Sequence, residues 1–153
     1  MDEPSSVFLS PDGSIAAVTC FSSDTLLIFE VDSDSGELTF STFFQDEIDG
    51  IDGLNGAANV IINQKSTAVY VTGYYDNSVS YYVLTGSAVA FHSNYKNGED
   101  GIEGMYLPKG MDFSSDNEKL YIAGSGSDGV AVFSINKNDV LDYIGNITSE
   151  MGI

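Results

Sequence analysis

Two acidic segments that contain glycine are the part of this sequence with the clearest potential for chemistry. They are QDEIDGIDG (residues 45–53) and GEDGIEG (residues 98–104). Calcium prefers oxygen ligands from carboxylates and backbone carbonyls, held on a loop that glycine allows to bend. The candidate ligands of a calcium ion are therefore Asp46, Asp49, Asp52, Asp100 and Glu103.

The same segments also fit a purely structural role. The alternating acidic spacing of an EF-hand is absent from both. In this second interpretation Asp49 and Asp100 cap turns, the glycines adopt positive φ, and Ile51 and Ile102 fill apolar grooves. Structural loops repeat as readily as ligand loops do, so the sequence leaves both interpretations open.

A second candidate set consists of residues in or beside turns that we expect on the same side of the molecule as the acidic segments. Aromatic rings next to carboxylates bind sugars or peptide surfaces, although they serve equally well in rim packing. These ligand-face candidates are Tyr74, Tyr75, Asp76, Tyr106 and Asp128.

Catalytic chemistry has little support within this chain. His92 is the only histidine and lies in a predicted outermost strand, so no Ser/His/Asp or Cys/His arrangement can be built around it. The only cysteine, Cys20, excludes an internal disulfide and is expected to be buried. We therefore assign no catalytic residue and no certain cofactor.

The charge of the chain excludes several partners. The sequence holds 23 acidic residues, five lysines and no arginine, which gives a net charge of −18. Such a chain repels nucleic-acid backbones and anionic membranes. No segment is long and apolar enough for membrane insertion, and the N-terminal MDEPSS lacks the features of a signal peptide. Cytoplasmic, extracellular and cell-surface locations all stay open.

Internal repetition reveals the elements that must position these residues. Ser10, Asn63 and Ser114 begin equivalent turns, at offsets of 53 and 51 residues, and DGIDGL (residues 49–54) matches DGIEGM (residues 100–105). A period in this range is typical of a solenoid, a propeller or an array. We expect one domain over residues 1–153, with repeats at about 4–48, 49–99 and 100–153.

Each repeat is predicted to form four short strands. In the second repeat we place them at 58–62, 68–74, 78–84 and 88–93, separated by turn-forming residues. The third strands, LLIFEV, VSYYVL and VAVFSI, are apolar nearly throughout, which indicates cover on both faces. Four-stranded antiparallel sheets stacked face to face provide that cover. The predicted fold is therefore all-β, with three β-propeller blades whose inner strands come first.

Local motifs support the same fold through a family resemblance. VYVTGYYDNSVSYY (residues 69–82) resembles the YVTN-type propeller repeat, with Gly73 where that repeat has Asn. The DGxxGL loops and GELTF (residues 36–40) are similar to lactonase-like or carboxymuconate cyclase-like seven-bladed propellers. The enzymes of this kind act on anionic substrates, which require clusters of basic residues. The resemblance therefore implies catalytic groups in blades outside this chain.

Three blades do not close a ring, because propellers contain about four to eight. We expect either that the chain is a segment of a longer propeller or that it self-associates, for example as two chains in a six-bladed ring. The first functional hypothesis is a non-catalytic scaffold whose acidic loop face binds a protein, a glycan or a cation. The alternative is a fragment of a propeller enzyme of the 6-phosphogluconolactonase or carboxymuconate cyclase type.

Overall fold

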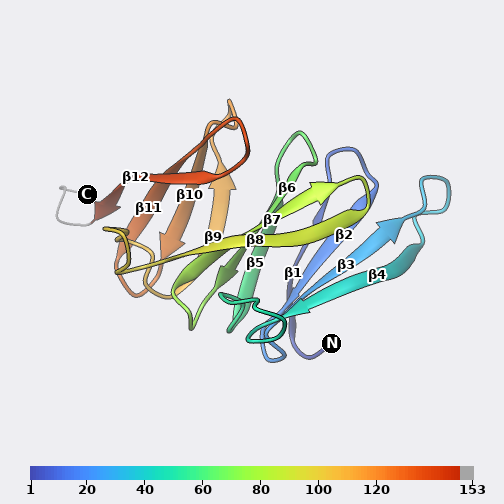
Figure 1. The fold of residues 1–153 in the computed structure, drawn as a ribbon, viewed down its shortest axis with the longest axis horizontal. Coiled ribbons are helices and arrows are strands. Elements are labelled where there is room, and N and C mark those ends of the chain that lie inside the picture. The colour runs from blue at the N-terminus through green and yellow to red at the C-terminus, as the bar shows by residue number, and fades with distance from the viewer. Residues whose placement is uncertain (149–153) are drawn as a thin grey trace.

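The computed structural model describes residues 1–148, and all of its regular secondary structure is β-strand. The strands form three separate four-stranded sheets, which stand beside one another in chain order (Figure 1). We call these sheets blade 1, blade 2 and blade 3. The strands of blade 1 are β1 (Pro4–Leu9), β2 (Ile15–Cys20), β3 (Thr25–Val31) and β4 (Leu38–Gln45). Blade 2 contains β5 (Ala57–Ile62), β6 (Ala68–Gly73), β7 (Ser78–Thr85) and β8 (Ala88–Lys96), and blade 3 contains β9 (Pro108–Phe113), β10 (Lys119–Gly124), β11 (Gly129–Ile135) and β12 (Leu141–Thr148).

The structure confirms the predicted antiparallel meander in each blade. Sheet order follows sequence order, and the three sheets share one register: Ala17 pairs with Ile28, Tyr70 with Tyr81, and Tyr121 with Val132. Each fourth strand carries an irregularity in its pairing with the third strand. In blade 2 this bulge accompanies a fourth strand that runs to Lys96, three residues beyond the predicted end, because a bulge adds a residue without ending the pairing.

The blades pack face to face through two apolar cores. Leu26 and Ile28 of blade 1 join Val69 and Tyr82 of blade 2 in the first core. The second core unites the opposite face of blade 2 with blade 3, so every residue of β6 is buried. This two-sided cover explains the continuous apolar character of the third strand in blade 2.

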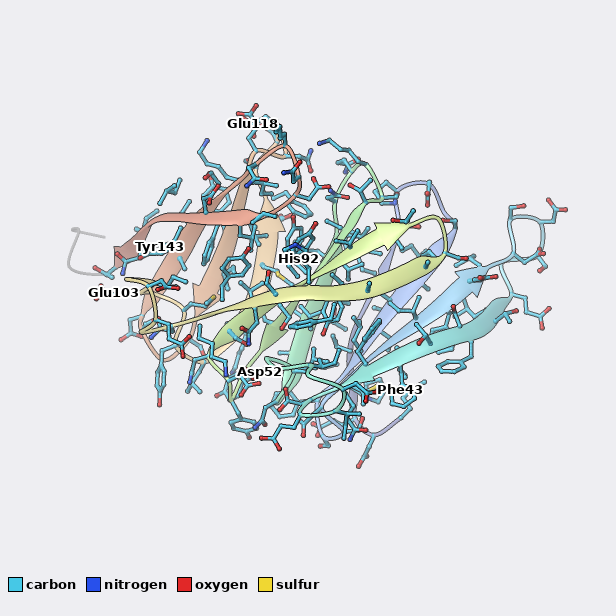
Figure 2. All side chains as sticks on the ribbon, in the orientation of Figure 1. Phe43, Asp52, His92, Glu103, Glu118 and Tyr143 are labelled. Atoms are coloured by element: carbon cyan, nitrogen blue, oxygen red, sulfur yellow. The ribbon has the colours of Figure 1, made fainter. Side chains whose placement is uncertain are left out.

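The first strands of the blades lie next to one another, with β5 between β1 and β9 (Figure 1). The fourth strands, β4, β8 and β12, form the opposite edges of the sheets. His92 lies on β8 as predicted (Figure 2), where its ring is 4.9 Å from the ring of Tyr81. Cys20 is buried, also as predicted. Among residues 1–148, no helix is long and apolar enough to cross a membrane.

Candidate functional site at the loop face

The loops between blades and the turns between second and third strands meet on one side of the molecule, as the sequence predicted. The amide of Gly56, in the loop before blade 2, donates a hydrogen bond of 2.7 Å to the Asp24 carboxylate in the turn of blade 1. The amide of Leu107, in the loop before blade 3, donates in the same way to the Asn77 side chain, at 2.9 Å. We call this side the loop face.

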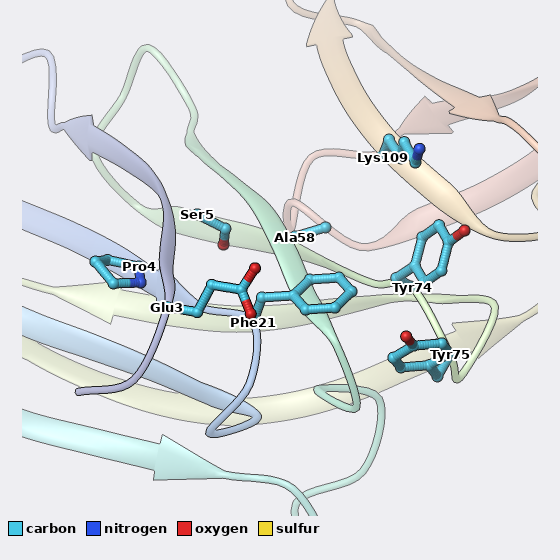
Figure 3. Close-up of a pocket in the computed structure, with 8 residues that line it drawn as sticks. All are labelled: Glu3, Pro4, Ser5, Phe21, Ala58, Tyr74, Tyr75 and Lys109. Carbon is cyan, nitrogen blue, oxygen red and sulfur yellow. The ribbon is translucent and has the colours of Figure 1, made fainter.

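A pocket of about 500 Å³ opens at the loop face, beside the first strands of the three blades (Figure 3). Aromatic rings and a few polar groups line it, which is the usual character of a small-molecule site. Its lining residues are Glu3, Pro4, Ser5, Phe21, Ala58, Tyr74, Tyr75 and Lys109. We call it the channel pocket.

Each blade contributes an equivalent first-strand residue to the channel pocket. Ser5, Ala58 and Lys109 each occupy the second position of their strand, so the repeat brings one hydroxyl, one methyl and one ammonium group to the same rim. The Ser5 hydroxyl donates to the carbonyl of Ala57, at 2.7 Å, and so ties blade 1 to blade 2. The ammonium group of Lys109 lies 5.6 Å from the centre of the Tyr74 ring, within the range of a cation–π contact.

Three aromatic rings form the wall of the channel pocket. Phe21, Tyr74 and Tyr75 contact one another with ring centroids 5.0 to 5.7 Å apart. Gly56 lies beside the side chains of all three residues and has a φ of +67°. A Cβ atom at Gly56 would lie 2.9 Å from Tyr75 and 3.2 Å from Tyr74, so the close approach requires glycine.

Three carboxylates gather at the loop face, two from the loop before blade 2 and one from the turn between β6 and β7. Asp46, Asp52 and Asp76 each place an oxygen within 4.8 Å of the others. The Asp46 carboxylate accepts a hydrogen bond from the amide of Leu54, and Asp76 accepts one from the amide of Asn55, both at 2.9 Å. We call these three residues the acid cluster. It joins two predicted metal ligands, Asp46 and Asp52, with one predicted ligand-face residue, Asp76.

Burial and one lysine shift the pKa values of two acid-cluster residues in opposite directions. Burial raises the pKa of Asp76 above its ordinary value, and the charge of Asp46 adds to this effect. Burial also acts on Asp52, but the hydrogen bond and charge of Lys96 outweigh it and hold the pKa of Asp52 below its ordinary value. The Lys96–Asp52 ion pair spans 2.9 Å. One cation therefore partly balances three carboxylates.

The loop before blade 3 is held by the same hydrogen bonds, but with neutral acceptors. Asn97 accepts from the amide of Met105, at 3.0 Å, and Ser127 accepts from the amide of Tyr106, at 3.3 Å. These residues replace Asp46 and Asp76 of the preceding loop. Holding the loop therefore requires only a hydrogen-bond acceptor, and the negative charge of the acid cluster is additional to that requirement.

The remaining predicted metal ligands lie apart from the acid cluster. In the part of the chain that the structure describes, Asp49, Asp100 and Glu103 belong to no group of three acidic side chains close enough to share an ion. Asp49 and Asp100 occupy positive φ in their loops. Figure 2 shows Asp52 and Glu103 on the loops before blade 2 and blade 3, respectively.

Two features of the structural interpretation agree with the structure. Ile51 and Ile102 are buried in the first and second apolar cores, where they fill the grooves between blades. The loop glycines adopt positive φ, at Gly50, Gly53, Gly101 and Gly104. The expectation that Asp49 and Asp100 cap turns is wrong, because neither side chain makes a hydrogen bond within residues 1–148. The loops are held instead by Asp24, Asp46 and Asp76 in one case and by Asn77, Asn97 and Ser127 in the other.

The ligand-face candidates divide between three places. Tyr74 and Tyr75 line the channel pocket, whereas Asp76 belongs to the acid cluster. Tyr106 packs against Gly126 in blade 3 and stays 47% exposed. Asp128 is exposed in the turn between β10 and β11, at the position equivalent to Asp24.

Sequence reasoning missed Glu3, Ser5, Phe21 and Lys109 in the channel pocket, and Lys96 beside the acid cluster. The repeat alignment contained a usable signal for one of them. Phe21 is equivalent to Tyr74, which was a ligand-face candidate, so the alignment predicts that Phe21 lies at the same side of the molecule. The Lys96–Asp52 pair joins the last residue of β8 to the loop before blade 2 and had no such signal.

Comparison with known proteins identifies the fold by structural similarity. No family model and no curated protein matches the chain. The periplasmic gluconolactonase PpgL of Pseudomonas aeruginosa is similar in structure, with a TM-score of 0.78 and 19% sequence identity over 94% of this chain and 39% of that chain. A proposed 6-phosphogluconolactonase from Bacteroides uniformis has a TM-score of 0.76 and 20% identity over 94% and 40%.

A third structure, the β-propeller domain of Cps50 (Swd1) from Myceliophthora thermophila, has a TM-score of 0.64 and 7% identity over 95% of this chain and 43% of that chain. The fold is that of three consecutive β-propeller blades. The chain spans about two fifths of the length of these structures, and identities of 7% to 20% carry information on fold alone.

Proposed function

We propose that this chain forms three blades of a lactonase-like propeller of the YVTN-repeat type, and that the channel pocket binds a sugar-acid lactone or the sugar acid that its hydrolysis yields. The observation that carries this proposal is the joint placement of Phe21, Tyr74, Tyr75 and Lys109 at the rim formed by the first strands. The structural similarity to gluconolactonase-type propellers supports it.

The chemistry of the channel pocket suits such a ligand. Aromatic rings offer apolar faces against which the C–H groups of a sugar pack. Lys109 supplies an ammonium group for a carboxylate or phosphate, and it is exposed enough to leave the Tyr74 ring for an anionic ligand. Glu3 carries a carboxylate that accepts hydrogen bonds, including one from the Ser22 hydroxyl, and it can accept others from sugar hydroxyls.

The test is binding of gluconate and 6-phosphogluconate to the purified chain by calorimetry, together with pH-stat hydrolysis of glucono-δ-lactone. We expect Tyr74→Ala and Lys109→Ala to weaken binding at least tenfold, which corresponds to about 1.4 kcal/mol. Lys137→Ala removes a lysine from the opposite side of the molecule and serves as the control for net charge. Equal effects of Lys109→Ala and Lys137→Ala would contradict the proposal.

As a second function, we propose that the acid cluster binds a divalent cation, with calcium as the candidate, within a non-catalytic acidic face. The observation in favour is the use of Asp46 and Asp76 where the next loop uses Asn97 and Ser127. Asp46 and Asp76 each use one oxygen in a hydrogen bond to a loop amide, which leaves the second oxygen of each for a hard cation. Such a cation takes about six to eight oxygen ligands.

Calcium titration followed by calorimetry and by thermal melting tests this second function. We expect calcium to raise the melting temperature of the unmodified chain and not that of Asp46→Asn/Asp76→Ser, which copies the neutral loop. Asp49→Asn/Asp100→Asn removes the same charge outside the cluster and should keep the response. An unmodified chain that does not respond to millimolar calcium would leave the acid cluster with a structural role only.

A further inference from the structure

Large apolar side chains are exposed on the two outward faces of the blade stack. Apart from residues in loops and at the N-terminus, the exposed large apolar residues of the described chain belong to blade 1 and blade 3: Val7, Leu9, Leu38, Phe40, Phe43, Ile144 and Ile147. Blade 2, which has a neighbour on each face, has none among its strands. Contiguous exposure of this kind marks an interaction surface.

The register of the sheets shows which face each of these residues occupies. In blade 2 the face toward blade 1 carries Val60, Ile62, Tyr82 and Phe91, all of which join the first core. The equivalent residues of blade 1, given by the matching strand pairs, are Val7, Leu9, Phe29 and Phe40. We call these four residues the leading face of blade 1.

The opposite end of the stack has the complementary set. In blade 2 the face toward blade 3 carries Tyr70, Val79, Tyr81 and Tyr95, which join the second core. The equivalent residues of blade 3 are Tyr121, Val130, Val132 and Ile147. We call these four the trailing face of blade 3. The same two kinds of face meet at both junctions inside this chain. The trailing face of blade 1 packs on the leading face of blade 2, and the trailing face of blade 2 packs on the leading face of blade 3.

We propose that the leading face of one copy of this chain packs against the trailing face of a second copy, as a third blade-to-blade junction of the same kind. The argument is continuity with two established interfaces, because both complementary faces are present on one chain and both lack a partner in the described structure. At the existing junctions Phe44 contacts Tyr82 and Tyr95 contacts Phe133. The equivalent contact between copies joins Ile147 to Phe29.

The leading face is hollowed, so side chains of a second copy can pack into it. A depression of about 520 Å³ lies on it, lined by Val7, Leu9, Ala16, Val31 and Leu38 among others. Its walls are apolar, so the burial of apolar surface stabilises the junction. The net charge of −18 on each copy opposes association, and salt should therefore strengthen it by screening.

The contact is heterologous, because two different faces meet. Such contacts form a closed ring when the rotation between copies allows it and an open chain of copies when it does not. The proposal does not depend on the function proposed for the channel pocket, since the two faces lie outside that pocket.

Light scattering after size-exclusion chromatography, over a range of protein and salt concentrations, measures the association. We expect dimers of about twice the 16.3 kDa chain mass, or larger assemblies, for the unmodified chain. Phe40→Asp alters the leading face and Ile147→Asp alters the trailing face, at side chains already 55% and 42% exposed. Each should weaken association at least about 30-fold, because the substitution places an unpaired carboxylate within an apolar contact.

Mixing the two variants distinguishes this arrangement from a symmetric one. Each variant keeps the face that the other has lost, so an equimolar mixture of Phe40→Asp and Ile147→Asp chains should regain a dimer. Ile48→Asp changes an equally exposed apolar residue in a loop and should leave association unchanged. Circular dichroism confirms that each variant keeps its β-sheet content.

Three results would overturn the proposal. An unmodified chain that is monomeric at every concentration and salt level has no such junction. Loss of association in Phe40→Asp but not in Ile147→Asp, without recovery on mixing, indicates a symmetric contact of two leading faces. Unchanged association in both variants places the contact elsewhere on the surface.

Discussion

Replacement of Gly56 by alanine tests the geometry of the channel pocket most directly. Gly56 has a φ of +67°, and a non-glycine residue in this region costs about 1–2 kcal/mol. The added Cβ would also lie 2.9 Å from Tyr75 and 3.2 Å from Tyr74, closer than ordinary van der Waals contact. The Tyr75 ring and the Cβ of Tyr74 must then shift, which disturbs the packing of the aromatic wall.

Gly86→Ala is a matched control for this substitution. Gly86 has a φ of +60°, and nothing lies within 4 Å of the Cβ that alanine would add. Gly86→Ala therefore carries the conformational cost alone. Since 1 kcal/mol shifts the melting temperature of a chain of this size by about 2–4 °C, a cost of about 1–2 kcal/mol should lower the melting temperature of Gly86→Ala by about 2–8 °C.

We expect Gly56→Ala to lower the melting temperature by a further amount of about 2–4 °C or more, because the steric conflict with the tyrosines adds a cost of about 1 kcal/mol or more. Thermal melting by circular dichroism and urea unfolding measure both variants. Equal losses of stability in Gly56→Ala and Gly86→Ala would refute the conclusion that Gly56 is required for the close packing of the aromatic wall. An unchanged near-ultraviolet spectrum of the tyrosines in Gly56→Ala would refute it as well.

Further predictions concern the core and the charged groups. Phe133→Ala should lower the free energy of unfolding, measured with urea, by about 3–5 kcal/mol because Phe133 is fully buried. Phe29→Ala should lower it less, because Phe29 lies on the leading face of blade 1 and is only partly buried. Hydrogen bonds, first of all from a neighbouring serine hydroxyl, lower the pKa of Asp12 from 3.8 to about 2. Because the pKa of Asp12 is lower in the folded state than in the unfolded state, its ionised carboxylate stabilises the fold above pH 3.8, and this contribution is lost as pH falls through about 2. Melting temperatures of the unmodified chain and Asp12→Asn, compared as a function of pH, measure this contribution. Lys96→Met should raise the pKa of Asp52 in NMR titration and cost about 1 kcal/mol or less, because the Asp52 side chain is 53% exposed and water screens the pair.

The fold was predictable because the repeat alignment and the strand periodicity agree. Equivalent positions such as Tyr82 and Phe133 fill the same place in successive blades and are both fully buried. Phe29, the third member of that column, is only partly buried, because no other blade of the described residues packs on its face of blade 1. The alignment therefore predicts position in the blade, whereas burial depends on the neighbour.

The site was predictable only in part. Tyr74 and Tyr75 were identified because they lie in a turn whose side of the molecule follows from blade topology. The acid cluster could not be derived from loop composition, because Asp76 comes from a different turn than Asp46 and Asp52. The orientation of Lys109 depends on the twist of its strand, which the sequence pattern alone does not define.

The exchange of Asp46 for Asn97 at equivalent positions has a consequence for how such chains diversify. The loop amide requires an oxygen at a fixed place, and carboxylate and amide side chains both provide it. Substitution between them changes the electric field over the loop face and leaves the backbone as it was. Duplicated blades can therefore acquire different ligand preferences by single substitutions, without any intermediate that fails to fold.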